Sequence, residues 1–197
     1  MPRLTFFLHL IWLLVWLPQL SQLVSGHRNN TYVREACHVT RYQDLCIHTL
    51  APFSSIAKRS PSKWARAGVA VTVTEAKRVF HFLAGLKRKR TMWGRNRSAL
   101  LDCVECLSDA VDNLHETLGV MRNLTVTTFE EQMEDVTTWL SAAMTDEGTC
   151  LDGFKGRKGN KVEVLRNMVS NATRVTSNAL ALVVKLATAG PQGQIEP

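Results

Sequence analysis

The sequence has no proline between residues 62 and 190, a run that covers most of its 197 residues. Proline breaks the interior of a helix because it lacks the backbone N–H and clashes with the preceding turn. The long proline-free run therefore favours helices and argues against a β-sandwich with many turns. With 45% hydrophobic and 21% charged residues, the composition is that of a globular protein of one domain.

Recognisable catalytic motifs are also absent. The sequence contains no Gly-X-Ser-X-Gly, no His-Glu-X-X-His and no glycine-rich phosphate loop. The pair Cys103 and Cys106 has neither a second Cys-X-X-Cys nor a histidine pair at the spacing of a zinc site. We therefore expect a chain that is not an enzyme, with no catalytic residues, no bound metal and no cofactor.

The first 26 residues have the features of a secretory signal peptide. Arg3 precedes an apolar stretch from Leu4 to Leu17, and the small residues before His27 suit cleavage after Gly26. The apolar stretch is shorter than the roughly 20 residues that a membrane-spanning helix needs. We predict a secreted, extracellular protein with no membrane anchor after signal removal and no nucleic-acid partner. Its domain would cover residues 27–190, followed by a polar tail over residues 191–197.

Secretion gives meaning to the cysteines and to the glycosylation sequons. Five cysteines in an oxidising compartment should form two disulfides and leave one thiol, but the spacing does not select the pairing. Asn-X-Ser/Thr sequons stand at Asn29, Asn96, Asn123 and Asn171, which we predict as glycosylation sites. The first three fall in apparent loops or the tail, whereas Asn171 falls within a helical pattern.

Apolar residues recur at spacings of three and four in four segments between residues 61 and 188, which predicts four amphipathic helices. Ser60-Pro61 is a start signal for the first helix, and Ser98 is a candidate N-cap of the second. Thr127 with Glu130 has the pattern of a capping box for the third helix, which Gly148 would end. The expected core residues are Val69, Val73, Ala76, Phe80, Leu83, Leu100, Val104, Leu107, Val111, Leu114, Leu118, Val126, Phe129, Met133, Val136, Leu140, Ala143, Val162, Leu165, Val169, Ala172, Thr176, Ala179, Val183 and Leu186.

Short connections between the predicted helices make consecutive helices antiparallel neighbours. The expected fold is therefore all-α, an up-down-up-down four-helix bundle over residues 61–188. Residues 29–58 stand outside the bundle, and Cys37 and Cys46 bracket a short helical piece there. A disulfide between these two cysteines would close an N-terminal helical hairpin extension.

The second predicted helix carries an acidic stripe on the side opposite its apolar residues. Five carboxylates follow one another at spacings of three and four, and residues 98–120 contain no Lys or Arg. A solvated face usually mixes charges of both signs, because like charges one turn apart repel. The stripe is either such a solvated face or a surface for a partner that offers positive charge and hydrogen-bond donors. Its members are Asp102, Glu105, Asp109, Asp112 and Glu116.

A basic cluster lies between the first two predicted helices. Residues 87–90 are all Lys or Arg, and Arg95 and Arg97 follow, with Trp93 among them. One interpretation is a patch for a polyanion, which in a secreted protein would be an acidic polysaccharide. The other is a solvated loop in which cations suit the C-terminal end of a helix.

Four segments of the chain carry recognisable patterns. They are residues 37–46 with a cysteine at each end, Ala99–Cys103 with Leu107–Leu114, residues 139–154 ending Thr149-Cys150-Leu-Asp152-Gly-Phe154, and Thr176–Leu182. Together they resemble the plant pectin methylesterase inhibitor and invertase inhibitor family, in which the first segment is similar to the N-terminal cysteine pair, the second to the central helix and the last to the final helix. Residues 139–154 are the most specific segment, and the resemblance covers about residues 32–188.

This resemblance implies a four-helix bundle with an N-terminal hairpin, in agreement with the periodicity. It also implies disulfides Cys37–Cys46 and Cys103–Cys150, which leave Cys106, a departure from the family's usual pattern, as a free thiol. Acidic or polar family positions match partner-binding residues on the second helix and after the third. These residues are Glu105, Asp109, Asp112, Thr149 and Asp152.

The implied function is that of a secreted inhibitor, located in the plant cell wall space, which covers the pectin-binding cleft of pectin methylesterase in a 1:1 complex. The alternative target is acid invertase, but invertase inhibitors of the family typically carry Pro-Lys-Phe, and no proline here is followed by Lys-Phe. A cell-wall protein in weak contact with acidic polysaccharide through the basic cluster, and a small lipid carrier, are less favoured alternatives.

Overall fold

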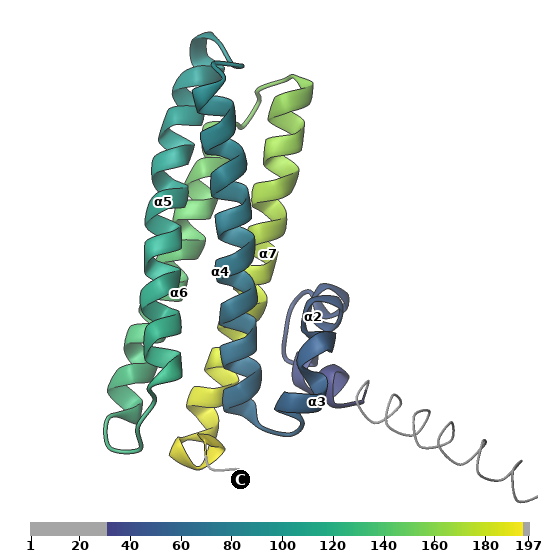
Figure 1. Cartoon of the computed structure of the whole chain (residues 1–197), viewed down its shortest axis with the longest axis vertical. Helices are drawn as coiled ribbons and strands as arrows, with labels where there is room; N and C mark the ends of the chain where they lie inside the picture. Colours follow the sequence, from purple (N-terminus) through teal and green to yellow (C-terminus); the bar gives the residue numbers. More distant parts are fainter. Residues whose placement is uncertain (1–30, 195–197) are drawn as a thin grey trace, which may run out of the picture.

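Four long helices run up and down along one axis in the computed structural model, which describes residues 31–194 (Figure 1). They are α4 (Pro61–Arg88), α5 (Gly94–Arg122), α6 (Phe129–Gly153) and α7 (Asn160–Ala189). No strand occurs among residues 31–194, so the predicted all-α, up-down-up-down four-helix bundle is confirmed. The predicted signal peptide and the sequon at Asn29 lie outside the described residues.

Each long helix packs against the helices before and after it, and α7 closes the ring by packing against α4. The bundle therefore has four sides in the order α4, α5, α6, α7, and the side formed by α5 and α6 is opposite the side formed by α4 and α7 (Figure 1). Of the described helices, none combines the length and the hydropathy needed to cross a bilayer.

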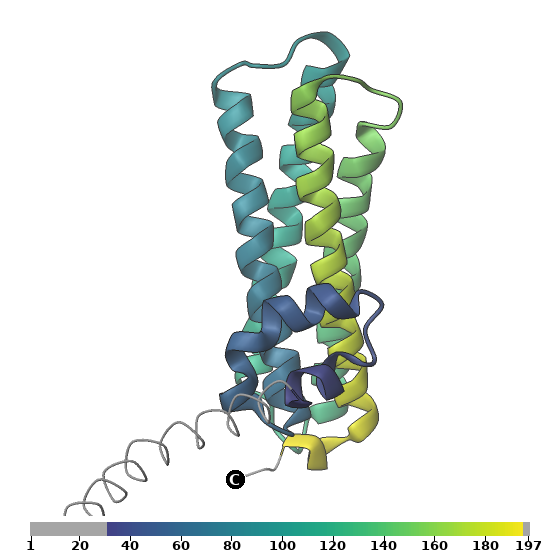
Figure 2. The same cartoon turned by 90° about the vertical axis from the view of Figure 1, so that its right-hand side faces the viewer.

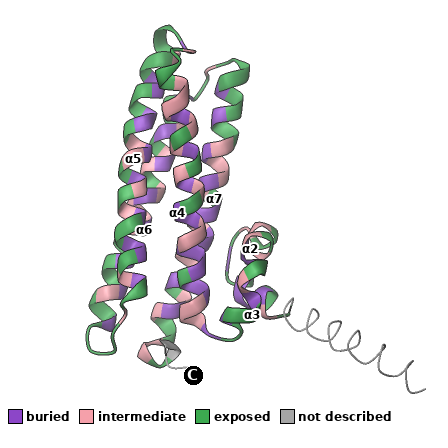
Figure 3. Ribbon diagram, viewed as in Figure 1, coloured by how far each residue is buried: buried purple, intermediate pink, exposed green. Residues whose placement is uncertain are grey.

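Nearly all of the residues predicted for the core are buried, and Figure 3 shows them on the inward sides of the helices. Three predictions are wrong in detail. Val111 is only partly buried at the edge of the core. Phe80 is only half-buried, because its neighbour Val79 occupies the central position of that turn. Val126 has 57% of its surface exposed, because it lies in the connection before α6 begins.

One of the predicted helix starts is confirmed and two are wrong. Ser60 is the N-cap of α4, and its hydroxyl accepts a hydrogen bond from the backbone N–H of Lys63 at 3.4 Å. Ser98 lies inside α5, which begins one turn earlier at Gly94. The capping box at Thr127 and Glu130 does not form, since Thr128 is the N-cap of α6 and makes no side-chain cap bond.

A glutamine one turn into α6 organises the connection from α5 instead. The side-chain oxygen of Gln132 accepts a hydrogen bond from the N–H of Thr125 at 2.9 Å, and its amide group donates to the carbonyl of Asn123 at 3.0 Å. These two bonds satisfy two backbone groups of the connection itself. Nor does Gly148 end α6, which continues to Gly153.

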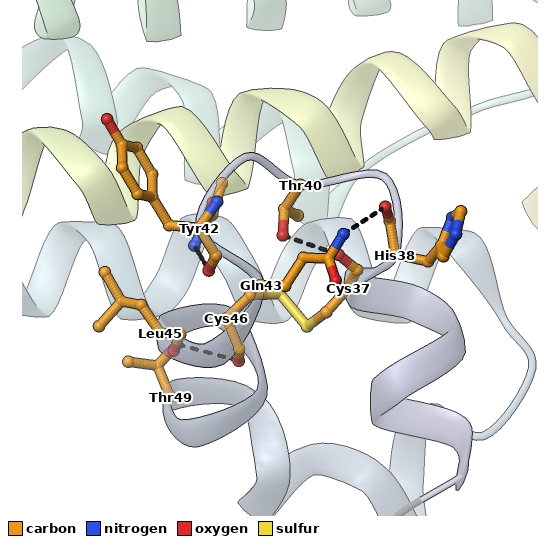
Figure 4. The surroundings of a disulfide bond; sticks show 9 residues. Cys37, His38, Thr40, Tyr42, Gln43, Leu45, Cys46 and Thr49 are labelled. Atoms are coloured by element: carbon orange, nitrogen blue, oxygen red, sulfur yellow. Dashed lines mark hydrogen bonds between the residues drawn. A yellow bond between two sulfur atoms is a disulfide. The ribbon is translucent and has the colours of Figure 1, made fainter.

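The predicted N-terminal hairpin consists of a helical segment over residues 31–37, a turn, and α2 (Gln43–Leu50). The short helices η1 (Ala51–Phe53) and α3 (Ser54–Ala57) lead from it into α4. A disulfide between Cys37 and Cys46 closes the hairpin, and the hydroxyl of Thr40 in the turn donates to the carbonyl of Cys37 at 2.7 Å (Figure 4).

The hairpin docks on the side of the bundle formed by α4 and α7 (Figure 2). Asn178, which is 96% buried on α7, accepts a hydrogen bond from the N–H of Tyr42 at 3.1 Å and donates to the carbonyl of Tyr42 at 2.9 Å. At the start of α4, the indole N–H of Trp64 donates to the carbonyl of Lys58 at 2.8 Å. The two Asn178 bonds attach the hairpin to α7, and the Trp64 bond ties the connection after α3 to the start of α4.

The apolar core is divided into two clusters along the bundle axis. One lies at the end that carries the hairpin and the other at the end that carries the α4–α5 and α6–α7 connections. Between them Glu147 of α6 is fully buried, and its carboxyl group accepts a hydrogen bond from the hydroxyl of Thr176 on α7 at 3.0 Å. Burial raises the pKa of Glu147 to about 8. This carboxyl group is therefore protonated at neutral pH.

Candidate partner-binding surface

The acidic stripe on α5 faces solvent along its whole length. All five of its carboxylate side chains are exposed, while the buried residues of α5 lie on the other side of the helix. Among residues 31–194, the one ion pair joins Arg78 to Glu75, at 2.6 Å on α4. The stripe is therefore not neutralised by cations of the described chain.

The neighbouring helix α6 extends this acidic surface. Phe129–Gly153 contains seven acidic residues and no Lys or Arg, so α5 and α6 together hold twelve of the 17 acidic residues of the chain. The opposite side is basic, since α4 and α7 hold ten of the 24 Lys and Arg residues and only two acidic ones. We call the exposed carboxylate side formed by α5 and α6 the acidic face.

Carboxylates meet at the seam between the two helices. Partial burial raises the pKa of Asp146 on α6, and the negative charge of Asp109 on α5 raises it further. The side-chain amide of Asn113 donates a hydrogen bond to Asp146 at 3.4 Å, and this bond lowers the pKa of Asp146. The seam therefore holds like charges close together, an arrangement that a cationic or hydrogen-bond-donating partner would relieve.

The five predicted partner-binding residues do not all lie together. Glu105, Asp109 and Asp112 lie on the acidic face, and Thr149 is exposed on α6 with its hydroxyl bonded to the carbonyl of Thr145 at 2.9 Å. Asp152 lines a groove between the end of α6 and the start of α7, away from the stripe. The prediction that the last two follow the third helix is wrong, because α6 includes both.

Sequence reasoning missed two residues of α6. Asp146 belongs to the acidic face, and Glu147 extends the apolar series Val136, Leu140 and Ala143 by one helical turn, which is a sign of burial. The predicted core series of this helix stops at Ala143, one turn before Glu147, and a pattern within one helix cannot place Asp146 beside α5. The described residues contain no group of three or more His, Cys, Asp or Glu side chains placed to hold a metal ion.

The second disulfide joins Cys103 of α5 to Cys150 of α6 and is buried in the core. Cys106 is the cysteine left unpaired, and it is partly exposed at the same seam. Burial raises the pKa of its thiol, and the charges of Asp146 and Asp109 raise it further. The thiol is thereby kept protonated, a form that reacts slowly.

Three of the four sequons lie in the described residues. Asn123 is exposed at the end of α5, and Asn96 lies in the first turn of α5 rather than in a loop. Asn171 is half-buried on α7, and its side-chain nitrogen, the atom that would carry a glycan, donates to the carboxylate of Glu75 at 3.0 Å. Glycosylation at all four sites stays a prediction.

A helical bundle with a disulfide-closed N-terminal hairpin and one un-neutralised acidic face defines a class of binding proteins. The family model described as "Plant invertase/pectin methylesterase inhibitor" matches residues 31–182. The chain belongs to this family, as the resemblance of its segments indicated. The family model and the two relatives described next are named as inhibitors, and the chain is not an enzyme.

Two relatives from Arabidopsis thaliana show the extent of the similarity. The chain is 49% identical to pectinesterase inhibitor 6 over 164 residues, which are 82% of this chain and 78% of that protein. It is 34% identical to pectinesterase inhibitor 3 over 174 residues, which are 84% of this chain and 85% of that protein.

The fold is similar to solved structures of the same family. A mutant form of an Arabidopsis pectin methylesterase inhibitor aligns with a TM-score of 0.61 at 19% identity, covering 75% of this chain and 92% of that one. A second Arabidopsis pectin methylesterase inhibitor aligns with a TM-score of 0.55 at 18% identity, covering 82% and 97%. At these identities the likeness concerns the fold.

Proposed function

We propose that the chain is a secreted inhibitor of pectin methylesterase that blocks the pectin-binding cleft of the enzyme in a 1:1 complex. The observation that carries the proposal is the acidic face, on which α5 and α6 present exposed carboxylates without a neutralising Lys or Arg. Like charges along one helix cost stability, so such a face is better explained by a complementary partner than by solvation alone. The relatives named pectinesterase inhibitors support this choice of partner.

Acid invertase is the second candidate target, because the family model includes both kinds of inhibitor. The absence of a proline followed by Lys-Phe, which invertase inhibitors typically carry, favours pectin methylesterase. The predicted signal peptide over residues 1–26 supports export to the plant cell wall, where pectin lies.

A paired titration tests the proposal. The mature chain, residues 27–197, is added in increasing amounts to several pectin methylesterases and to acid invertase. We expect methanol release from pectin to fall to a minimum near an equimolar ratio, because a 1:1 complex saturates there, while sucrose hydrolysis continues. Inhibition of invertase alone would reverse the target. A stoichiometry far from one, or no inhibition of any esterase tested, would contradict the proposed complex.

A further inference from the structure

The α4–α5 and α6–α7 connections lie at the same end of the bundle, although they are separated by some 60 residues of sequence (Figure 1). The side chain of Lys161, at the start of α7, donates a hydrogen bond to the carbonyl of Thr91 in the α4–α5 connection at 3.3 Å. The two connections therefore form one surface, which we call the basic end.

This surface collects nearly half of the positive charge of the chain. Eleven of the 24 Lys and Arg residues lie in the two connections and the adjoining helix turns, and ten of these eleven side chains are exposed. They are Lys87, Arg88, Lys89, Arg90, Arg95, Arg97, Lys155, Arg157, Lys158, Lys161 and Arg166.

Few carboxylates accompany these cations. Asp152 and Glu163 line the same groove as four of them, but no carboxylate of residues 31–194 lies within 4.0 Å of any of the eleven. Arg157 instead donates to the carbonyl of Gly153 at 2.6 Å. Unpaired cations gathered on one surface create a local positive potential that attracts a polyanion.

The shape of the basic end suits a polymer. A groove of about 700 Å³ runs between the end of α6 and the start of α7, lined by Lys155, Arg157, Lys158 and Arg166 among others. Trp93, in the other connection, has 73% of its surface exposed. An exposed indole offers a flat apolar surface to a sugar ring, while the surrounding cations suit carboxylates at intervals along a chain.

We propose that the basic end binds a polyuronate, the carboxylate form of the pectin backbone, through both connections together. This choice of polyanion rests on the proposed function: hydrolysis of pectin methyl esters releases methanol and leaves a carboxylate on each sugar. The basic end does not include Glu105, Asp109 or Asp112 of the α5 stripe. Asp152, which is also a predicted partner-binding residue, lines its groove. The stripe therefore stays available to the enzyme while the basic end holds the enzyme's product.

The test measures binding to polygalacturonate with a variant that removes two cations from each connection, Lys89→Gln, Arg95→Gln, Lys155→Gln and Lys158→Gln. We expect its dissociation constant to rise about tenfold, because four exposed charge contacts are lost together. The matched control removes four cations near the opposite end, Arg59→Gln, Lys63→Gln, Arg66→Gln and Arg122→Gln, and should bind like the parent. Circular dichroism checks that both variants fold.

Two further comparisons make the result specific. If both connections bind the polymer, each half-variant should lose part of the affinity. One half-variant replaces only Lys89 and Arg95, and the other replaces only Lys155 and Lys158. Fully methyl-esterified pectin should bind far more weakly than polygalacturonate, and raised salt should weaken the polygalacturonate complex.

The proposal is wrong if the control loses as much affinity as the variant, if one pair accounts for the whole loss, or if esterified pectin binds equally well. Tighter binding to a homopolymeric RNA or to phosphatidylserine vesicles than to polygalacturonate would mean that the ligand of the basic end is another polyanion. Polygalacturonate binding without inhibition of any esterase would contradict the proposed function but not this inference. Inhibition without polygalacturonate binding would contradict this inference but not the proposed function.

Discussion

Asp109 occupies the centre of the acidic face, and its charge acts across the seam on a residue of the neighbouring helix. Burial raises the pKa of Asp146, and the charge of Asp109 raises it further because the cost of two like charges in proximity opposes ionisation. A partner that places a cation or a donor at the seam removes that cost on binding. We therefore expect substitutions of single residues on this face to affect partner binding more than folding.

Charge reversal separates these two roles. The variant Glu105→Lys, Asp109→Lys and Asp112→Lys should lose inhibition of pectin methylesterase while it keeps its helical circular dichroism. Exposed substitutions change stability by about 0.5 kcal/mol each. Losing a complementary charged contact in a buried interface costs about 2 to 5 kcal/mol. Methanol release at a fixed enzyme concentration compares the inhibition by the variant with the inhibition by the parent.

A control with the same change in net charge is available away from the acidic face. Glu35→Lys, Asp44→Lys and Glu163→Lys alter three exposed carboxylates on the hairpin and on α7. This control should inhibit like the parent. Full inhibition by the acidic-face variant would show that the stripe only faces solvent and that the enzyme contacts another surface.

At the scale of whole elements, a buried polar side chain of α7 helps to hold the N-terminal hairpin on the bundle. Asn178 pairs with both backbone groups of Tyr42, and the guanidinium groups of Arg41 and Arg174 lie 5.6 Å from the ring of Tyr42. A buried amide with both partners in place stabilises the contact, while removal of one member leaves the other unsatisfied.

The variant Asn178→Ala should therefore loosen the hairpin more than the bundle. We expect a loss of about 1 to 3 kcal/mol in the free energy of unfolding, the cost of a buried unsatisfied polar group. Hydrogen exchange should rise over residues 31–57 and much less over α5 and α6. Asn167→Ala, at an exposed position of the same helix, should change neither quantity. Equal exchange across all helices would mean that Asn178 stabilises the bundle as a whole.

Helix faces could be predicted from the sequence more reliably than helix ends. The eight core positions predicted for α7 are all buried, because a period of 3.6 residues leaves one inward side wherever four helices pack. The ends depend on tertiary contacts: α6 passes Gly148 because Cys150, two residues later, is buried and bonded to Cys103. Compared with that contact, a glycine is only a weak signal for the end of a helix.

The candidate surface shows the same limit. The stripe on α5 could be predicted because it lies within one helix, whose periodicity places its members on one side. The contribution of α6 could not, since it requires knowing that Asp146 lies opposite Asp109 and Asn113. The joining of the two basic connections likewise depends on the bundle topology.

At the scale of the whole molecule, the buried Glu147 makes stability depend on pH. Below the ordinary carboxyl pKa of 4.5 both the folded and the unfolded chain hold this proton. As pH rises above that value, the unfolded chain releases the proton while the folded chain keeps it up to about pH 8, so unfolding becomes more favourable. The nearest groups are Thr176 and Thr173, whose hydroxyls favour the ionised form, and Asp146 and Glu75, whose charges oppose it.

The variant Glu147→Gln should remove this dependence. Between pH 5 and pH 7 the parent should lose about 3 kcal/mol of stability from this group, whereas the variant should lose almost none. Urea unfolding at several pH values measures the two slopes. Glu134→Gln, an exposed change on the same helix, should leave the parent slope unchanged. Identical slopes for parent and Glu147→Gln would mean that Glu147 is ionised in the folded protein.

The opposition of acidic and basic sides across the bundle has a kinetic consequence. With α5 and α6 negative and α4 and α7 positive, the electric dipole of the molecule has a component across the bundle, in addition to the component along the helix axes that the basic end creates, although the net charge is +7. A positively charged target repels the net positive charge of the chain, but its field also rotates the chain so that the negative side of the dipole faces the target. The chain therefore approaches with α5 and α6 facing the target, so a larger share of diffusional encounters leads to binding. This increase in the association rate becomes smaller as added salt shortens the Debye length.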